Sequence, residues 1–447
     1  MCGGESATAR VPLPQAEKGS NDFPWHLGAI DTHCHPTDMM SSIASLPTMR
    51  TRVLIIMATR SEDQDLVEQV GVQHSFSDRA ALATPAVGGS TVTDKIVPAF
   101  GWHPWFVHHL YDDTGNGTST YDAASASTEE GKREQKEKHY SAVLTHKPDA
   151  AFIASLPDPK SLSSYLAETR NRLAGNPLAL IGEVGIDTMC RLPVAWTEAD
   201  HLRHNQELTP GGREGRALTK HNVEKSHQVR ILTAQLRLAG ELGRAVSIHG
   251  VQGHGLLHDT LASLWKGYEK EIPSRRKQKR VALGAEDFSS SDEESDASEE
   301  WDDGPQESDD KVEIILDAPK KKQKQKPYKP KPFPPRVCMH SFSGTKEVVT
   351  QYLKPEVPVR IFFGFSTGVN LSGPSAEKSR SMEEKFVEII KLVPDDRILI
   401  ESDWHTAGEE MDYFLEHMYR KVCNIKGWTL EAGVAQIRKN YEEYIFG

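Results

Sequence analysis

The chain has 447 residues, a formal net charge of −11 and only 37% hydrophobic residues. Part of it is therefore expected to stay unpacked, and the negative charge excludes a folded body that binds polyanions by bulk charge alone. A run of about 18 apolar residues, as a membrane span requires, is absent, and five scattered cysteines are typical of reduced thiols in the cytoplasm or nucleus.

Eight short apolar runs recur along the chain and predict strands that are buried on both faces. They are residues 27–32, 52–58, 96–102, 178–184, 245–248, 336–340, 359–363 and 397–401. Helical patterns lie between them, for example in residues 221–242, which end before Gly243, and in residues 381–392. Strands that alternate with helices indicate a parallel sheet, and eight of them predict a closed (β/α)₈ TIM barrel of the metal-dependent hydrolase type.

Three polar regions exceed the roughly 250 residues that such a barrel needs. They are predicted to be low-complexity loop insertions at about 111–150, 192–220 and 272–335, within a single barrel of residues 26–447. The last insertion has basic, acidic and lysine-rich stretches and is predicted to be disordered. Its lysines fit a nuclear localisation signal, a nucleic-acid contact or a plain solvated linker. Residues 1–25 are predicted to be a flexible tail.

The first predicted strand ends in two histidines, His33 and His35, separated by Cys34. Residues two apart on a strand point to the same side, so both imidazoles face one direction while the cysteine faces the other. A histidine pair at the carboxyl end of a barrel strand predicts a metal site.

Four later strands also end in side chains that bind metals. Glu183 follows a buried apolar run, where a free carboxylate is costly unless it is paired or coordinated. His249 and His340 end the fifth and sixth strands, and Asp403 follows the eighth. Because the carboxyl ends of barrel strands converge, these residues and the histidine pair predict one site, and their donor atoms suit Zn²⁺, Mn²⁺ or Fe²⁺.

The third strand leads into a further histidine, His103, at the same end of the predicted barrel. We interpret it as a contact for substrate or phosphate rather than as a metal ligand. A purely structural histidine is the competing interpretation.

Six motifs, taken in this order, closely resemble the TatD family of metal-dependent deoxyribonucleases. They are IDTHCH (30–35), GWHP (101–104), IGEVGID (181–187), SIH (247–249), HSFSG (340–344) and ESDW (401–404). The resemblance implies two divalent ions, Mg²⁺, Mn²⁺ or Zn²⁺, and hydrolysis of DNA from 3′ to 5′ by metal-activated water. The metal ligands that it implies are His33, His35, Glu183, His249, His340 and Asp403. It further implies that Glu183 bridges the ions and that Asp403 orients or deprotonates the water.

The sequence departs from the family pattern in its loops. Family members usually lack the expansions at 111–150 and 272–335, and residues 250–254 lack an arginine that is often found there. Family members usually have a threonine before the last acid, whereas this chain has Ser402 before Asp403, and Trp404 follows Asp403. Loops decide specificity on a shared barrel, so the substrate preference stays open.

Two other functions are compatible with the same barrel. A metal-dependent amidohydrolase or ester hydrolase usually bridges its metals with a carboxylated lysine on the fourth strand, but residues 178–187 contain no lysine. A non-catalytic adaptor would recruit protein partners through residues 272–335.

Overall fold

The computed structural model describes residues 22–83, 94–115, 119–272, 328–371 and 375–447. Most of the predicted tail and of the insertion at 272–335 lies outside these residues, so those two predictions stay open. The chain divides into a barrel unit, residues 1–270 and 330–447, and a unit of residues 271–329. Within the described residues, no helix is long and apolar enough to cross a membrane.

Eight parallel strands form the barrel, as predicted. They are β1 (Ile30–Cys34), β2 (Val53–Met57), β3 (Ile96–Phe100), β6 (Leu180–Asp187), β7 (Val246–Val251), β8 (Arg336–Met339), β9 (Arg360–Phe365) and β10 (Ile398–Ile400). They pair in this order, which is also their order in the chain. The two edge strands meet just beyond β10, where Asp403 N–H donates to His33 O at 3.0 Å and His35 N–H donates to Trp404 O at 2.8 Å.

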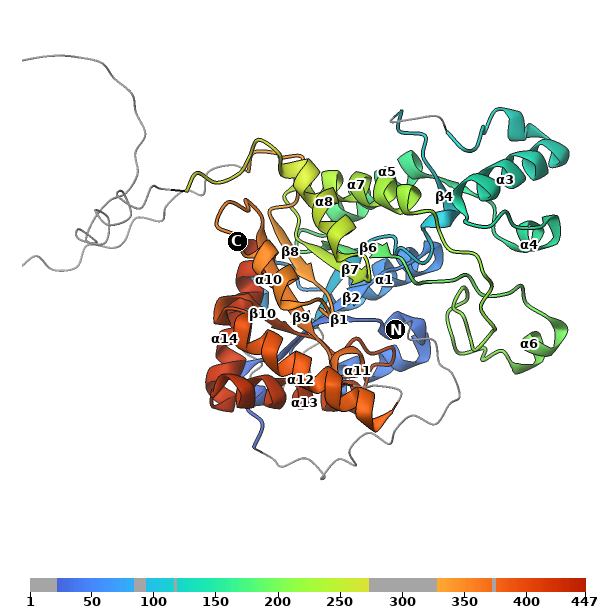
Figure 1. The fold of residues 1–447 in the computed structure, drawn as a ribbon. Helices are drawn as coiled ribbons and strands as arrows, with labels where there is room; N and C mark the ends of the chain where they lie inside the picture. The colour runs from blue at the N-terminus through green and yellow to red at the C-terminus, as the bar shows by residue number, and fades with distance from the viewer. Residues whose placement is uncertain (1–21, 84–93, 116–118, 273–327, 372–374) are drawn as a thin grey trace, which may run out of the picture. The chain divides into compact units, whose positions relative to one another are not determined.

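Helices surround these strands (Figure 1). The α-helices are α1 (Ser61–His74), α2 (Arg79–Ala83), α3 (Glu129–Val143), α4 (Ala150–Ser155), α5 (Leu162–Gly175), α6 (Glu198–Arg203), α7 (Lys225–Leu242), α8 (His254–Trp265), α10 (Lys346–Tyr352), α11 (Thr367–Asn370), α12 (Ala376–Leu392), α13 (Glu409–Lys426) and α14 (Leu430–Phe446). Short 3₁₀ segments are η1 (Trp25–Leu27), η2 (Pro36–Asp38), η3 (Met40–Thr48), η4 (Val107–His109), η5 (Ser125–Ser127) and η6 (Asp395–Arg397). A small separate sheet pairs β4 (Leu110–Tyr111) with β5 (Lys160–Ser161).

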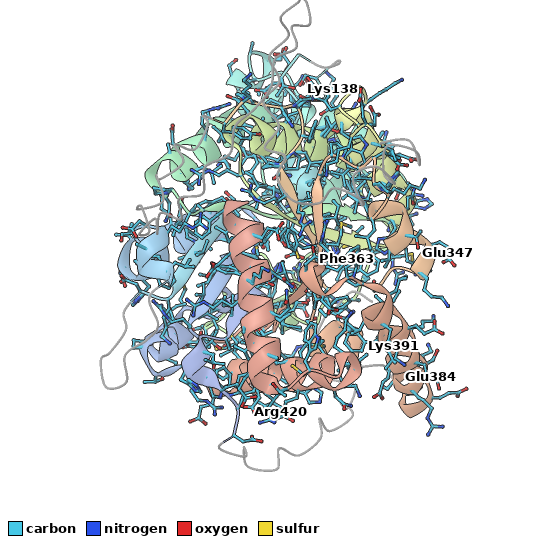
Figure 2. All side chains as sticks on the ribbon, turned by 90° about the vertical axis from the view of Figure 1, so that its left-hand side faces the viewer. Lys138, Glu347, Phe363, Glu384, Lys391 and Arg420 are labelled. Carbon is cyan, nitrogen blue, oxygen red and sulfur yellow. The ribbon has the colours of Figure 1, made fainter. Side chains whose placement is uncertain are left out.

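Apolar periodicity explains how the helices attach to the barrel. In α7, Leu232, Leu236 and Ala239 are buried, and the helix ends at Gly243, whose φ of 67° is the left-handed conformation that glycine tolerates best. Figure 2 shows the buried Phe363 of β9 inside the molecule, whereas charged side chains such as Glu384 of α12 extend outward. Burial of one face of each element therefore fixes the strand ends that carry the site.

The segment 111–150, predicted as a polar loop insertion, contains the helix α3. His139, Tyr140 and Val143 are buried on one side of this helix. The ring of His139 bonds the carbonyl oxygen of His108 through Nε2 at 2.8 Å, which ties α3 to η4. The structure thus differs from the loop expectation, because three apolar or neutral side chains spaced along one helical face suffice to dock an otherwise polar segment.

Residues 192–220, here called the arm, contain the short helix α6 and extended chain that returns to the start of the barrel. Thr209 donates from its N–H to Asp38 O at 2.9 Å and from its hydroxyl to Thr37 O at 2.6 Å. Arg60, which follows β2, donates to Pro210 O at 2.9 Å. The arm therefore reaches from the end of β6 to the loop after β1, immediately beside His35.

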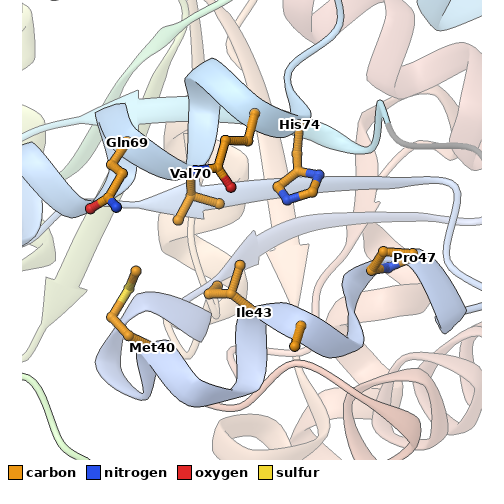
Figure 3. Close-up of a pocket in the computed structure, with 8 residues that line it drawn as sticks. Met40, Ile43, Pro47, Gln69, Val70 and His74 are labelled. Carbon is orange, nitrogen blue, oxygen red and sulfur yellow. The ribbon is translucent and has the colours of Figure 1, made fainter.

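Residues 330–335 belong to the barrel unit rather than to the insertion at 272–335. Phe333 is buried, and Lys331 N–H donates to Gly240 O of α7. A hollow of about 300 Å³ lies between η3 and α1 and is lined by residues such as Met40, Ile43 and Val70 (Figure 3). None of the predicted site residues lines it, so it is not the predicted site.

Candidate metal centre

The six predicted ligands meet around the carboxylate of Glu183, at the carboxyl ends of five strands. One oxygen of Glu183, Oε2, lies 3.5 Å from His33 Nε2 and 3.4 Å from His35 Nε2. Its other oxygen, Oε1, lies 3.0 Å from His249 Nδ1 and 3.6 Å from His340 Nε2. A single carboxylate thus faces imidazoles of four of the predicted ligands, two through each of its oxygens.

Asp403 completes one side of this cluster. Its Oδ1 lies 3.5 Å from His35 Nε2, and its Oδ2 lies 3.7 Å from His340 Nε2. The φ of Asp403 is 55°, a conformation that is strained for a residue other than glycine. In this conformation the side chain of Asp403 enters the cluster while its N–H closes the barrel. Strained backbone conformations are often found at functional sites.

The geometry of the donor atoms fits divalent cations. His33 Nε2 and His35 Nε2 lie 3.1 Å apart, within hydrogen-bond distance, and both nitrogens also approach Glu183 Oε2. Within the described chain, three groups of donors are compact enough to share an ion. They are His33 with His340 and Asp403, His33 with His35 and Glu183, and His103 with Glu183 and His249. Imidazole and carboxylate donors without thiols suit Zn²⁺ or Mn²⁺, and carboxylates suit Mg²⁺.

Two buried carboxylates orient His340 and His249 by contacting the ring nitrogen that does not face the cluster. The sequence patterns assigned no role to these carboxylates. Glu401 Oε1 lies 3.0 Å from His340 Nδ1, so that His340 Nε2 points into the cluster. Asp187 Oδ2 lies 3.5 Å from His249 Nε2, which leaves Nδ1 facing Glu183. Outer carboxylates of this kind fix the tautomer of a ligating histidine and raise its basicity.

Asp31 plays a related part in the backbone around the cluster. Its Oδ1 accepts from the N–H groups of His33 and Ser402, which joins β1 to the end of β10. Burial raises the pKa of Asp31 to about 7, against the opposing effect of these hydrogen bonds.

Without bound ions the carboxylates hold protons on some of the histidines. Burial alone lowers the pKa of His35, but the hydrogen bond to Asp403 and the charge of Glu183 raise it to about 9. Burial also lowers the pKa of His249, but hydrogen bonds to Asp187 and Glu183 raise it to about 10. Burial lowers the pKa of His33 to about 4. Electrostatic attraction and hydrogen bonds from the surrounding histidines hold the pKa of the Asp403 and Glu183 carboxyls below the usual range despite burial.

His103 lies beside the cluster, with its Nε2 3.1 Å from Glu183 Oε1. Its other nitrogen, Nδ1, accepts the backbone N–H of Trp105 at 3.0 Å. An acceptor nitrogen carries no proton, so the proton of the neutral ring sits on Nε2 and is donated to Glu183. Burial lowers the pKa of His103 to about 4, which keeps the ring neutral. In this tautomer His103 is a hydrogen-bond donor to Glu183, and the same residue belongs to one of the three compact donor groups.

A family model and two related proteins assign the chain to the same family. A model of the family described as "TatD related DNase" matches residues 30–446. The chain is 32% identical to "Cut9-interacting protein scn1" of Schizosaccharomyces pombe, over 93% of this chain and 98% of that protein. It is 23% identical to "Uncharacterized deoxyribonuclease YMR262W" of Saccharomyces cerevisiae, over 80% of this chain and 84% of that protein.

Two solved structures also match most of the chain at low identity. One is the TatD homologue YJJV from Escherichia coli, with a TM-score of 0.43 and 13% identity over 94% of this chain and 98% of that one. The other is a TatD family hydrolase from Entamoeba histolytica, with a TM-score of 0.44 and 12% identity over 94% of this chain and 98% of that one.

Proposed function

Because the chain belongs to the TatD-related DNase family, and is thus a metal-dependent hydrolase that acts on ester bonds of DNA, we propose that its reaction takes place at the Glu183 cluster. The observation that supports this most strongly is the convergence of four imidazoles, those of His33, His35, His249 and His340, on the two oxygens of one carboxylate. We propose that the protein cleaves DNA from 3′ ends.

In this proposal Glu183 would take part in holding both divalent ions. His33, His35 and Asp403 would help to hold one ion, whereas His249 and His340 would help to hold the other. Divalent ions in such a site lower the pKa of water and neutralise charge on phosphoryl oxygens. They also replace the protons on the histidines, since only a neutral imidazole is a ligand.

The protein's own groups would move the proton and hold the phosphate. The side chain of Asp403 is 17% exposed, compared with 6% for Glu183, so an attacking water reaches it more easily. Its low pKa keeps it ionised at neutral pH, as a proton acceptor must be. The Nε2–H of His103 would donate to a phosphate oxygen, because the ring is held in that tautomer by Trp105 N–H.

The decisive test is hydrolysis of single-stranded and duplex DNA by metal-stripped protein to which Mg²⁺, Mn²⁺ or Zn²⁺ is restored. We expect metal-dependent cleavage that Glu183→Ala and Asp403→Asn abolish. Glu443→Gln is a matched control, since it removes one negative charge on α14 that pairs with Arg360 of β9. Full activity of both site variants would refute the proposal. Absence of cleavage with every metal, in protein that binds the ions, would favour an amide or carboxylic ester substrate.

A second role is suggested by the S. pombe relative, whose name records an interaction with Cut9. We propose that this chain also binds a protein partner, and that residues 272–335 form the contact. Deletion of residues 273–327 should abolish binding to the Cut9 homologue of the same organism and leave DNA hydrolysis intact. Unchanged binding would refute this role for the insertion. We expect the protein in the cytoplasm or nucleus, which imaging of the tagged full chain tests.

A further inference from the structure

A tryptophan stands at one side of the metal centre. Trp105 follows β3, and its ring centroid lies 4.7 Å from that of His103 and 6.0 Å from that of His249. The indole Nε1–H donates to the buried Asp187 at 2.7 Å, which fixes the plane of the ring. The residue is only partly buried, so the ring is rigid and still accessible.

A second ring stands at the other side. His405 follows β10, and its imidazole stacks on that of His35, with centroids 5.2 Å apart and planes at 18°. Its Nδ1 bonds Asp38 at 2.7 Å, while 58% of its side chain is exposed. Both rings, here called the flanking rings, are therefore held by a carboxylate and presented to solvent. Glu183 lies between them, since it contacts both His103 and His35.

The site needs a source of binding energy other than positive side chains. The ion pairs described for Glu183 and Asp403 are all with histidines. The guanidinium of Arg60 is buried and already engaged by Asp38, Asp63 and the carbonyls of the arm. In the described part of the chain, the cluster's carboxylates thus pair with histidines and Arg60 is already engaged, whereas flat, rigid rings stand beside the proposed reacting position.

We propose that Trp105 and His405 stack on the two bases that flank the scissile phosphate, one base on each ring. This inference rests on the proposed nuclease function and deepens it. Bases stack on protein rings only when they are unpaired, so the substrate class is a single strand or a frayed end. Stacking is tolerant of sequence because every base has a π face. The site should therefore prefer single-stranded over double-stranded DNA and show little preference for base sequence.

Steady-state kinetics on a single-stranded oligonucleotide test the proposal. Trp105→Leu and His405→Ala should each lower kcat/KM about tenfold, mainly through KM, as the loss of one stacked base predicts. Trp105→Phe and His405→Phe keep a ring but lose the hydrogen bonds to Asp187 and Asp38, and each should retain most of the activity. If Trp105→Phe is as impaired as Trp105→Leu, the tryptophan only positions Asp187 and the proposal fails.

Substrates with one abasic nucleotide distinguish stacking from any indirect effect. An abasic nucleotide at the position that stacks on Trp105 should slow the wild-type protein about tenfold. On that strand the rate of Trp105→Leu should equal the wild-type rate within about twofold. An abasic nucleotide on the opposite side of the cleaved bond should have the same effect on the comparison of His405→Ala with the wild type. Equal impairment of a variant on intact and abasic strands, whichever side is abasic, would overturn the assignment of its ring.

A binding assay separates this inference from the proposed reaction. A phosphorothioate strand that carries 2-aminopurine beside the central linkage should lose fluorescence when it binds the metal-loaded protein. Trp105→Leu with unchanged metal content should restore most of that fluorescence. If the wild-type protein cleaves no DNA yet quenches the probe through these rings, the proposed reaction fails while the stacking surface stands. Cleavage without ring-dependent quenching would overturn the stacking surface and leave the proposed reaction intact.

Discussion

Replacement of Glu401 by glutamine isolates the effect of one buried charge on metal binding. Glu401 is fully buried, and its Oε1 both accepts Ser341 N–H and faces His340 Nδ1 at 3.0 Å. A glutamine amide oxygen can occupy the position of Oε1 and accept both groups. The ring of His340 then keeps its orientation but loses the charge that makes Nε2 a stronger donor.

The expected loss is large because water does not screen a buried pair. Changes to carboxylates behind ligating histidines typically cost about 10- to 100-fold in metal affinity or activity, or about 1.4–2.7 kcal/mol. Calorimetric titration of Mn²⁺ or Zn²⁺ into metal-free protein measures this directly. Glu443→Gln, an equal change of charge at a partly exposed ion pair, should bind the metal as the wild-type protein does. If Glu401→Gln binds the ion within about twofold of the wild type, our account of His340 is wrong.

Proton release, motion of the arm and core packing provide three further tests. Metal binding at pH 7 should release about two protons, because pKa values near 9 for His35 and 10 for His249 keep both rings protonated until an ion displaces the protons. The metal affinity should therefore rise with pH. Calorimetric titrations in buffers of different ionisation enthalpy measure the released protons, and the absence of any release would contradict the prediction. Arg216→Ala removes a guanidinium that lies 4.5 Å over Trp196 and bonds three arm carbonyls, so deuterium exchange should accelerate in the arm but not in the strands. Phe363→Ala should lower the free energy of unfolding by about 3–5 kcal/mol in urea titrations, and a loss below about 1 kcal/mol would contradict its place in the core.

The barrel was predictable because strands buried on both faces must be apolar throughout. Each of the eight predicted runs overlaps a strand of the barrel, with ends displaced by a few residues. Placement of the ligands followed from the same geometry, since side chains at the carboxyl ends of parallel barrel strands have no other place to meet. The proximity of His33 and Asp403 was therefore predictable from the order of the strands alone.

The orienting carboxylates were missed, although the sequence carried a signal for them. Asp31 precedes His33 by two residues, Glu401 precedes Asp403 by two, and Asp187 follows Glu183 by four. Even spacing along a strand places side chains on the same side, so each acid was bound to lie near the cluster. By contrast, the docking of the arm on the loop after β1 depends on pairing between distant segments, which local composition does not encode.

The closure of the barrel by the site's own backbone bears on how the protein is made. The hydrogen bond from Asp403 N–H to His33 O joins residues 370 positions apart in the chain, and the strand that brings Asp403 is the eighth of eight. A ribosome delivers the first histidines long before the last acid, so a partly synthesised chain carries an incomplete cluster. The cluster is thus complete only when the chain has been made through residue 403 and the last strand has joined the first.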